Sequence, residues 1–286
     1  MNLRNIKCKN HNSEALLSFS KYPNHLKVCD KCLLIFKHYK NPIKHVTSLK
    51  KFNDKNFFNI SNEEIKSEIK LINKFLKILN IKDKIEVLDY GCGYGSFLEA
   101  LKRKKIKGYG YDVNKFFYKN LNYKYNMFRE RKKIEKSNKK FDIIFLRKVL
   151  NLSSNIIEDF IFFKKILKKN GHLIILDQVT EYNKFAYSSL YFKKKSNNTY
   201  LLSLQSLIKI AKSFHLKIIK KNNFFGNIEL ILKNIDLGTS NFIKEKKFYN
   251  FKVKMKIHLY SGFMFIFFYR ILKYLQILIK NLNMPK

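Results

Sequence analysis

Three glycines at alternate positions form the sharpest chemical motif of the chain. Gly91, Gly93 and Gly95 follow a short apolar segment, residues 85–90, which includes the acid Asp89. Glycine lets a backbone turn tightly and approach a ligand closely, and ligands bind just after the buried strands of an open parallel sheet. A carboxylate before the first glycine suits a cationic ligand better than a pyrophosphate. The motif therefore predicts a ligand-binding loop whose ligand carries positive charge.

A second acid, Asp112, ends the next strand-like segment, residues 107–112. A carboxylate at this place binds the ribose hydroxyls in dinucleotide-binding folds. The dinucleotide fingerprint itself does not fit, because its third glycine would fall at Ser96 or Leu98. The two acids predict a ligand with a ribose and a cationic group. S-adenosylmethionine (SAM) meets both conditions, since it carries an ammonium and a sulfonium.

Cysteine and histidine are grouped near the N-terminus as Cys8-x-x-His11 and Cys29-x-x-Cys32. Two short ligand pairs joined by a loop are typical of a tetrahedral structural zinc site, which four ligands close. Four unrelated residues are the alternative, and an iron–sulfur site fits less well because of the histidine. This spacing argues against a disulfide framework and favours a reducing, cytoplasmic compartment.

The order of predicted elements indicates an α/β fold with a Rossmann-like, doubly wound sheet. A capping box, Ser61 with Glu64, opens a helix that ends near residue 79. The last two strands are joined by too short a link for a crossover, so the last strand should be antiparallel. Further helices are predicted from residue 97 and at 156–167 and 203–213, and strands at 85–90, 107–112, about 125–128, 141–146, 172–177, 217–219 and 228–232.

Three regions follow from these patterns: a zinc-ribbon-like module (1–50), the α/β domain (60–236) and a basic, then apolar tail (237–286). Residues 257–279 contain only two charges, Arg270 and Lys273. They are long enough to span a bilayer, but a charge at a helix centre costs about 2.5–3.5 kcal/mol. We expect a helix packed on the domain or a partner. The alternative is an interfacial helix on anionic lipid, peripheral to the inner face of the membrane.

The formal net charge of +38 comes from 59 Lys and Arg against 21 Asp and Glu. Enrichment in Lys, Asn, Ile, Phe and Tyr indicates drift toward A/T-rich codons, and attraction to an anion such as nucleic acid is the functional alternative. Only six residues are Arg, whereas proteins that read bases usually use more, because Arg bonds guanine in bidentate fashion. Residues 1–11 contain no apolar run, so no secretory signal is expected.

The segment 87–95 resembles motif I of class I SAM-dependent methyltransferases, and Asp112 resembles their ribose-binding acid. Residues 141–144 resemble the fourth strand of that family, and residues 167–173 resemble the turn before its fifth strand. The resemblance implies SAM as cofactor and roles by position. Asp89 orients the loop or, through water, the SAM ammonium. The loop Gly91, Cys92, Gly93 and Gly95 passes under the methionine part, Asp112 bonds the ribose, Val113 packs near the adenine, and Leu146 and Arg147 lie beside the methionine tail.

The N-terminal residues 26–36 resemble the zinc-ribbon domain that precedes the SAM domain in some bacterial methyltransferases. Many of these act on sugar nucleotides or in surface-polysaccharide pathways, so the resemblance implies a small-molecule or saccharide acceptor. The family usually has Cys where His11 stands. The alternatives are an RNA methyltransferase, a non-catalytic zinc-held interaction module, and a lipid-surface protein.

The general base is not defined by any motif. Relatives often carry Leu-Glu-His after the fourth strand, but Leu150, Asn151 and Leu152 stand here. The adenine N-methyltransferase signature is also absent from the sequence. Methyl transfer needs a base only where the acceptor must lose a proton. The candidates are Asp177, Glu181 and Tyr182, which lie at and beyond the end of the fifth strand of the family pattern.

Overall fold

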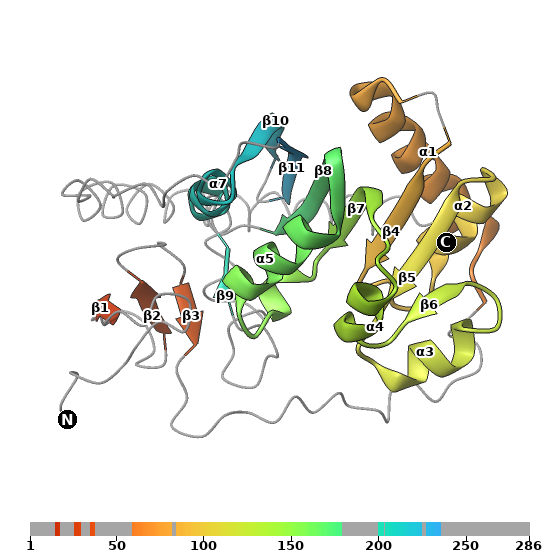
Figure 1. Cartoon of the computed structure of the whole chain (residues 1–286), viewed down its shortest axis with the longest axis horizontal. Coiled ribbons are helices and arrows are strands. Elements are labelled where there is room, and N and C mark those ends of the chain that lie inside the picture. The colour runs from red at the N-terminus through yellow and green to blue at the C-terminus, as the bar shows by residue number, and fades with distance from the viewer. Residues whose placement is uncertain are drawn as a thin grey trace, which may run out of the picture.

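A seven-stranded sheet forms the centre of the protein, seen here in a computed structural model (Figure 1). The structure describes residues 15–17, 26–29, 35–37, 59–81, 84–178, 200–202, 204–224 and 227–235. Neighbouring strands in the order β6, β5, β4, β7 and β8 are all parallel, as the alternation of elements predicts. The strands are β4 (Glu86–Tyr90), β5 (Lys107–Tyr111), β6 (Asn126–Phe128), β7 (Phe141–Arg147), β8 (Leu167–Gln178), β10 (Leu216–Phe224) and β11 (Asn227–Asn234).

The last two strands form an antiparallel hairpin, and this prediction is confirmed. Strand β11 lies between β8 and β10 and is antiparallel to both, with Ile228 opposite Asp177. Strand β10 is therefore one of the two edge strands of the sheet. Strand β11 lies between β8 and β10, so the connection through α7 passes over the position of one strand.

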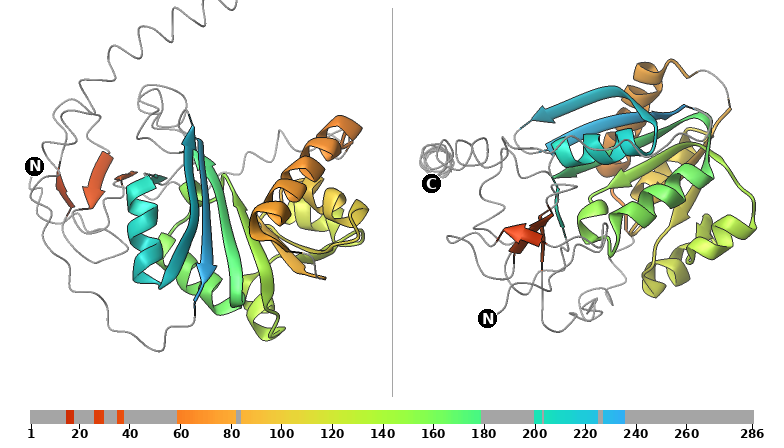
Figure 2. Two further views of the ribbon diagram at one scale, coloured as in Figure 1. Left: turned by 90° about the horizontal axis from the view of Figure 1, so that it is seen from above. Right: turned by 60° about the vertical axis from the view of Figure 1, so that its left-hand side comes forward.

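Helices cover both faces of the sheet (Figure 2). On one face, α1 and α2 bury Phe75 and Phe97 against Phe145 of β7. On the other face, α4, α5 and α7 cover a core that includes Phe160 and Leu207. The helices are α1 (Asn62–Leu79), α2 (Ser96–Arg103), α3 (Lys115–Leu121), α4 (Arg131–Lys136), α5 (Ile156–Ile166) and α7 (Leu204–Ser213), with a 3-10 turn, η4 (Leu150–Leu152).

Helix α1 begins and ends at the residues that its sequence specifies. The Ser61 side chain accepts a hydrogen bond from the Glu64 N–H at 3.1 Å, which satisfies one of the free amides of the first turn. Asn80 ends the helix in the left-handed conformation, with φ 51°. The capping box places Glu64, and one turn later Glu68, on the end of α1 that lies nearest the glycine loop.

A second, four-stranded sheet joins N-terminal strands to a segment that follows β8. Its order is β1 (Ala15–Leu17), β2 (Leu26–Cys29), β3 (Ile35–Lys37) and β9 (Tyr200–Leu201), and all neighbours are antiparallel. Strand β9 also contacts η4, and the adjacent Leu202 is buried in the main core.

Several predictions fall outside the described residues. Of the proposed zinc ligands, Cys8, His11 and Cys32 lie outside them, and Cys29 is placed only as the last residue of β2. The tail, residues 237–286, lies outside them too. Among the helices of the described ranges, none has the length and apolar character needed to cross a membrane.

Candidate functional site

The glycine loop connects β4 to α2 and is fastened to the end of β5. The carbonyl of Tyr111 accepts hydrogen bonds from the N–H groups of Gly91 at 2.7 Å and Cys92 at 3.1 Å. All three glycines have positive φ, with 85° at Gly91 and 89° at Gly95. Glycine adopts these angles without the steric cost that other residues incur. The motif thus forms the tight strand-to-helix turn that its spacing predicts.

Gly91 and Gly93 differ in the space that their surroundings leave for a side chain. A Cβ built on Gly91 would lie 2.4 Å from Cγ2 of Val149, so a side chain cannot be added without moving the loop. A Cβ built on Gly93 would meet no atom of the described residues within 4 Å. The loop therefore packs against Val149 at Gly91, whereas the space beside Gly93 is free of described residues.

Asp112 joins the loop to the end of β5. Its Oδ2 accepts the N–H of Gly93 at 3.0 Å, and its Oδ1 accepts the N–H of Asn114 at 2.8 Å. Burial raises the pKa of this carboxyl group, and the two backbone N–H groups act against that rise. Each carboxylate oxygen has two lone pairs, so both oxygens can accept a further hydrogen bond from a ribose hydroxyl.

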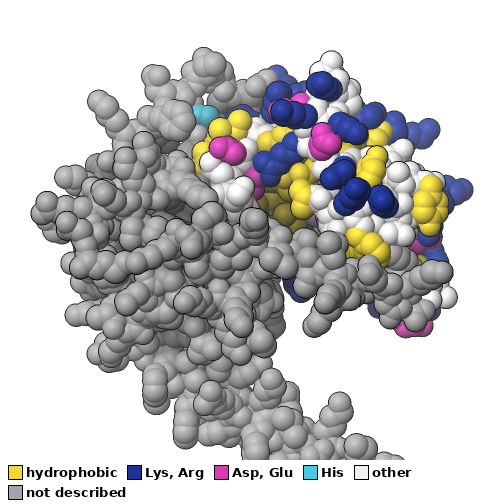
Figure 3. Space-filling model, turned by 90° about the horizontal axis from the view of Figure 1, so that it is seen from below, with side chains coloured by type: hydrophobic (Ala, Val, Ile, Leu, Met, Phe, Trp, Pro, Cys, Tyr) yellow, Lys and Arg dark blue, Asp and Glu magenta, His cyan; other side chains and the backbone are white. Residues whose placement is uncertain are grey.

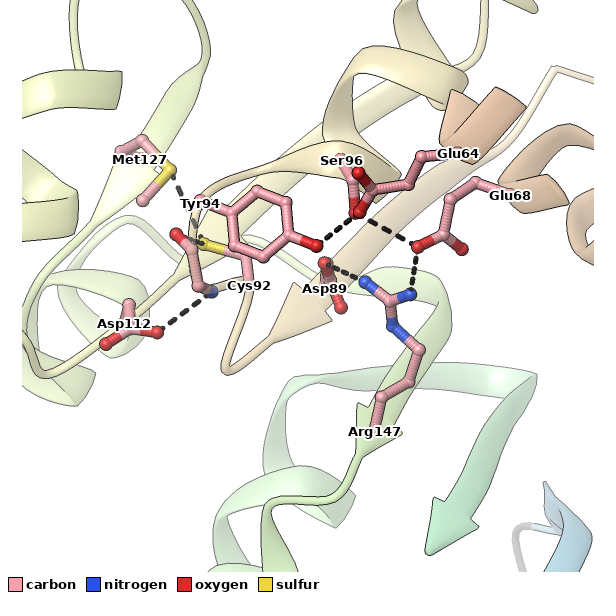
Figure 4. A network of polar contacts seen from close by, with 10 residues as sticks. Glu64, Glu68, Asp89, Cys92, Tyr94, Ser96, Asp112, Met127 and Arg147 are labelled. Carbon is pink, nitrogen blue, oxygen red and sulfur yellow. Dashed lines mark hydrogen bonds and ion pairs between the residues drawn. The ribbon is translucent and has the colours of Figure 1, made fainter. Parts of the chain in front are cut away.

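Asp89 is fully buried and forms an ion pair with Arg147 at the end of β7 (Figure 4). Nη2 of Arg147 lies 3.0 Å from Oδ2 of Asp89, and Nη1 lies 2.7 Å from Oε1 of Glu68 on α1. The guanidinium also lies over the ring of Phe97, 4.5 Å from its centroid. Burial raises the pKa of Asp89, and the Arg147 charge opposes this rise.

Helix α1 supplies further contacts to the loop that the sequence did not reveal. Glu64 accepts a hydrogen bond from the hydroxyl of Tyr94, and Glu68 accepts one from Ser96 Oγ at 3.0 Å (Figure 4). Both glutamates lie one turn apart and so share a face of the helix. The capping box located this end of α1, but nothing in the spacing indicated that the end packs on the loop.

The remaining residues that the sequence predicts for the site lie at or near the carboxyl ends of the parallel strands. Val113 is 70% exposed just after β5, whereas Cys92 is buried, and burial raises the pKa of its thiol well above the usual range. Leu146 is buried in the core on the face that α5 covers, away from Arg147. Asp177 is buried at the end of β8. The other candidate bases, Glu181 and Tyr182, lie outside the described residues.

Charge is distributed unequally between the carboxyl ends and the amino ends of the parallel strands. Acids occupy the carboxyl ends of the strands and the facing end of α1, namely Glu64, Glu68, Asp89, Asp112 and Asp177. The opposite ends of the strands carry lysines that precede or open strands, namely Lys105, Lys107, Lys139, Lys140 and Lys168. Two acids also lie there, Glu86 and Asp142, and they pair with Lys107 and Lys168. Elsewhere the basic side chains are scattered, as the described part of the face in Figure 3 shows. The glycine loop is therefore surrounded by acidic side chains, although the protein as a whole is strongly basic.

A family model described as "Methyltransferase domain" matches residues 62–221, which is more than half of the chain. The matched range includes the glycine loop, Asp112 and Arg147. The chain therefore belongs to the methyltransferase-domain family. It is a SAM-dependent methyltransferase, as the sequence resemblance predicts. A comparison with curated proteins gave no match.

Solved structures show the same fold at low sequence identity. The PH0226 protein from Pyrococcus horikoshii OT3 matches with a TM-score of 0.50 and 15% identity, covering 65% of this chain and 98% of that one. A SAM dependent methyltransferase from Archaeoglobus fulgidus matches at 0.49 and 15%, covering 63% and 97%. The plantazolicin methyltransferase BpumL, solved in complex with SAH, matches at 0.48 and 17%, covering 68% and 91%. At these identities the likeness concerns the fold alone.

Proposed function

We propose that this methyltransferase binds SAM on the glycine loop and transfers its methyl group to a small-molecule or saccharide acceptor. The observation that carries the proposal is the group of acids around the loop, at the carboxyl ends of the strands and the facing end of α1. SAM carries an ammonium and a sulfonium, which these acids attract. Two features of the loop fit this ligand. Among the described residues, the buried Oδ1 of Asp89 has no hydrogen-bond partner, and none reaches within 4 Å of a Cβ built on Gly93.

In this proposal each residue acts on a defined part of the cofactor. Asp112 accepts hydrogen bonds from the ribose hydroxyls, Val113 packs beside the adenine, and Asp89 faces the ammonium. The bound cofactor supplies the methyl group, and the protein holds it in line with the acceptor. Asp177 remains the candidate base among the described residues, since it ends a strand at the same edge of the sheet.

The carboxylates around the loop disfavour the close approach of an RNA backbone, whereas a saccharide, or the sugar end of a sugar nucleotide, can approach without bringing phosphates to them. With radiolabelled SAM, we expect label to enter members of a panel of saccharides and sugar nucleotides, and none to enter transcribed RNA. The net charge of +38 should let RNA bind in a salt-dependent way without being methylated. Methylation of RNA, with log affinity falling linearly against log salt, would establish the RNA alternative instead.

We also propose that Cys8, His11, Cys29 and Cys32 hold one structural zinc ion. The strands β1, β2 and β3 have three to four residues each, and such short pieces gain stability from a metal that joins their turns. Among the described residues there is no other group of three His, Cys, Asp or Glu that could hold a metal.

The zinc proposal predicts about one zinc per chain in the purified protein, and its loss in Cys32→Ser. Cys92→Ser is the matched control, since Cys92 lies in the glycine loop and should leave the zinc content unchanged. Metal analysis by mass spectrometry measures both. Zinc that persists in Cys32→Ser, or is absent from the intact protein, contradicts the proposal. Zinc binding with no turnover on any acceptor would favour the non-catalytic module.

A further inference from the structure

Asp89, Arg147 and Glu68 form a charge cluster that joins three elements, β4, β7 and α1 (Figure 4). The cluster holds two carboxylates and one guanidinium, so it retains one unit of negative charge. Side chains of Arg147 and Glu68 are only 22% and 14% exposed, and that of Asp89 is 1% exposed. A buried excess charge is costly unless a ligand or a proton neutralises it.

The two oxygens of Asp89 differ in their surroundings. Oδ2 accepts a hydrogen bond from Arg147 at 3.0 Å, whereas Oδ1 is buried and has no partner in the described part of the chain. Arg147 is itself fixed from two further sides, by Glu68 at 2.7 Å and by the ring of Phe97. The carboxylate therefore cannot rotate freely, and the oxygen that lacks a donor is the one that Arg147 leaves unused.

We propose that Arg147 is a positioning residue for the cofactor: it holds one oxygen of Asp89 and so directs the other toward the ammonium group of the methionine part. The inference rests on the proposed place of SAM on the glycine loop and goes beyond it in assigning a role to Arg147. Glu68 takes part as the second anchor of the guanidinium. Because Oδ1 is covered in this arrangement, its surroundings must move to admit the ammonium.

Arg147 also favours the charged form of Asp89. Burial alone raises the pKa of Asp89 and favours its neutral form, which could not attract an ammonium. The other groups that face this carboxyl are Glu68 from α1, Asp112 from the end of β5 and Cys92 in the loop. The two acids favour the neutral form further, and the Cys92 thiol stays uncharged because burial raises its pKa. Arg147 is thus the single cation that these described neighbours offer to Asp89.

The test compares two ligands that differ only in the amino-acid part. S-adenosylhomocysteine carries the ammonium, whereas 5′-methylthioadenosine keeps the adenosine and the thioether but lacks the ammonium and the carboxylate. By calorimetry, Arg147→Met should weaken S-adenosylhomocysteine binding by roughly 10- to 100-fold, as for a lost hydrogen bond to a charged group. Binding of 5′-methylthioadenosine should stay within about threefold of the wild type. Arg147→Lys, which keeps the charge, should recover part of the difference.

A pH series separates positioning from a merely structural role. In Arg147→Met, S-adenosylhomocysteine affinity should rise with pH as the unpaired Asp89, whose pKa burial raises, loses its proton. The wild type should change much less with pH. Arg131→Met is the matched control, because it removes the ion-pair partner of the buried Asp159 on the other face of the sheet. It should lower stability without changing the ratio of the two affinities.

Two results would overturn the proposal. If Arg147→Met weakens both ligands equally and without pH dependence, Arg147 only supports the fold. If Arg147→Met binds S-adenosylhomocysteine more tightly than the wild type, the guanidinium occupies the place of the ammonium instead. Failure of the wild-type protein to bind either ligand is a different outcome, since it would remove the proposed cofactor site itself.

Discussion

Replacing Gly91 by alanine should reduce SAM affinity by about 100-fold or more while most of the chain stays folded. The new Cβ would lie 2.4 Å from Cγ2 of Val149, and the φ of 85° is strained for any residue with a side chain. Strain of this kind costs about 1–2 kcal/mol, and overpacking adds about 1–3 kcal/mol. The loop must shift to relieve both, and a misplacement of about 1 Å can cost 10²-fold. Calorimetry with SAM and thermal unfolding measure the two effects.

The double variant Gly91→Ala/Val149→Ala separates the overlap from the backbone strain. Val149 is the side chain nearest to the added Cβ, so its truncation removes the overlap and leaves only the φ of residue 91 unfavourable. We expect SAM affinity to return partway toward that of Val149→Ala alone. Equal affinities for Gly91→Ala and the wild type would show that the loop geometry does not govern binding.

Asp112→Ala should reduce SAM affinity by roughly 10²-fold, because it removes the ribose acceptor and the bond that holds the loop at Gly93. The carboxylate accepts the N–H groups of Gly93 and Asn114, and hydrogen bonds to a charged group contribute about 1.5–3 kcal/mol each. Since the charged form binds the hydroxyls better, wild-type affinity should also fall as the pH falls through the raised pKa of Asp112. Calorimetry across acidic and neutral pH measures both effects.

Asp142→Ala is the matched control for this experiment. Asp142 also accepts a backbone N–H, that of Glu86 at 2.8 Å, but it lies at the opposite edge of the sheet beside Lys168. Its loss should lower stability and leave SAM affinity nearly unchanged. If Asp112→Ala and Asp142→Ala weaken SAM to the same extent, the ribose assignment is wrong and the effect is one of general stability.

The sequence was most informative where a segment has one strong local pattern. A continuous apolar run predicted β7 to within one residue at each end, and the capping box located the start of α1. The run at 172–177 located only the second half of β8, because this strand begins at Leu167, where the turn before it was expected. The helices α3 and α4 were missed, because residues 115–140 are polar and lack a clear period. The loop was recognised from its glycines, whose positive φ angles no other residue adopts as readily.

The contacts between distant segments could not be predicted in this way. Arg147 was placed beside the cofactor from its position alone, yet its ion pairs depend on Glu68, which lies on a different element. The pairing of β3 with β9 likewise has no local signal, since two residues of β9 do not make a periodic pattern. The zinc ligands, the tail and the location in the cell stay predictions.

The pairing of β3 with β9 affects the order in which the chain can assemble. Phe36 of β3 lies opposite Tyr200 of β9. In the sequence, all the elements from α1 to β8 therefore lie between these two paired strands of the small sheet. During synthesis the N-terminal strands emerge first but must wait for β9, which follows only after the parallel part of the large sheet has been made. Contacts so far apart in sequence form slowly. The N-terminal strands therefore keep an unpaired edge throughout most of translation, and this is the interval in which a nascent chain is most exposed to aggregation.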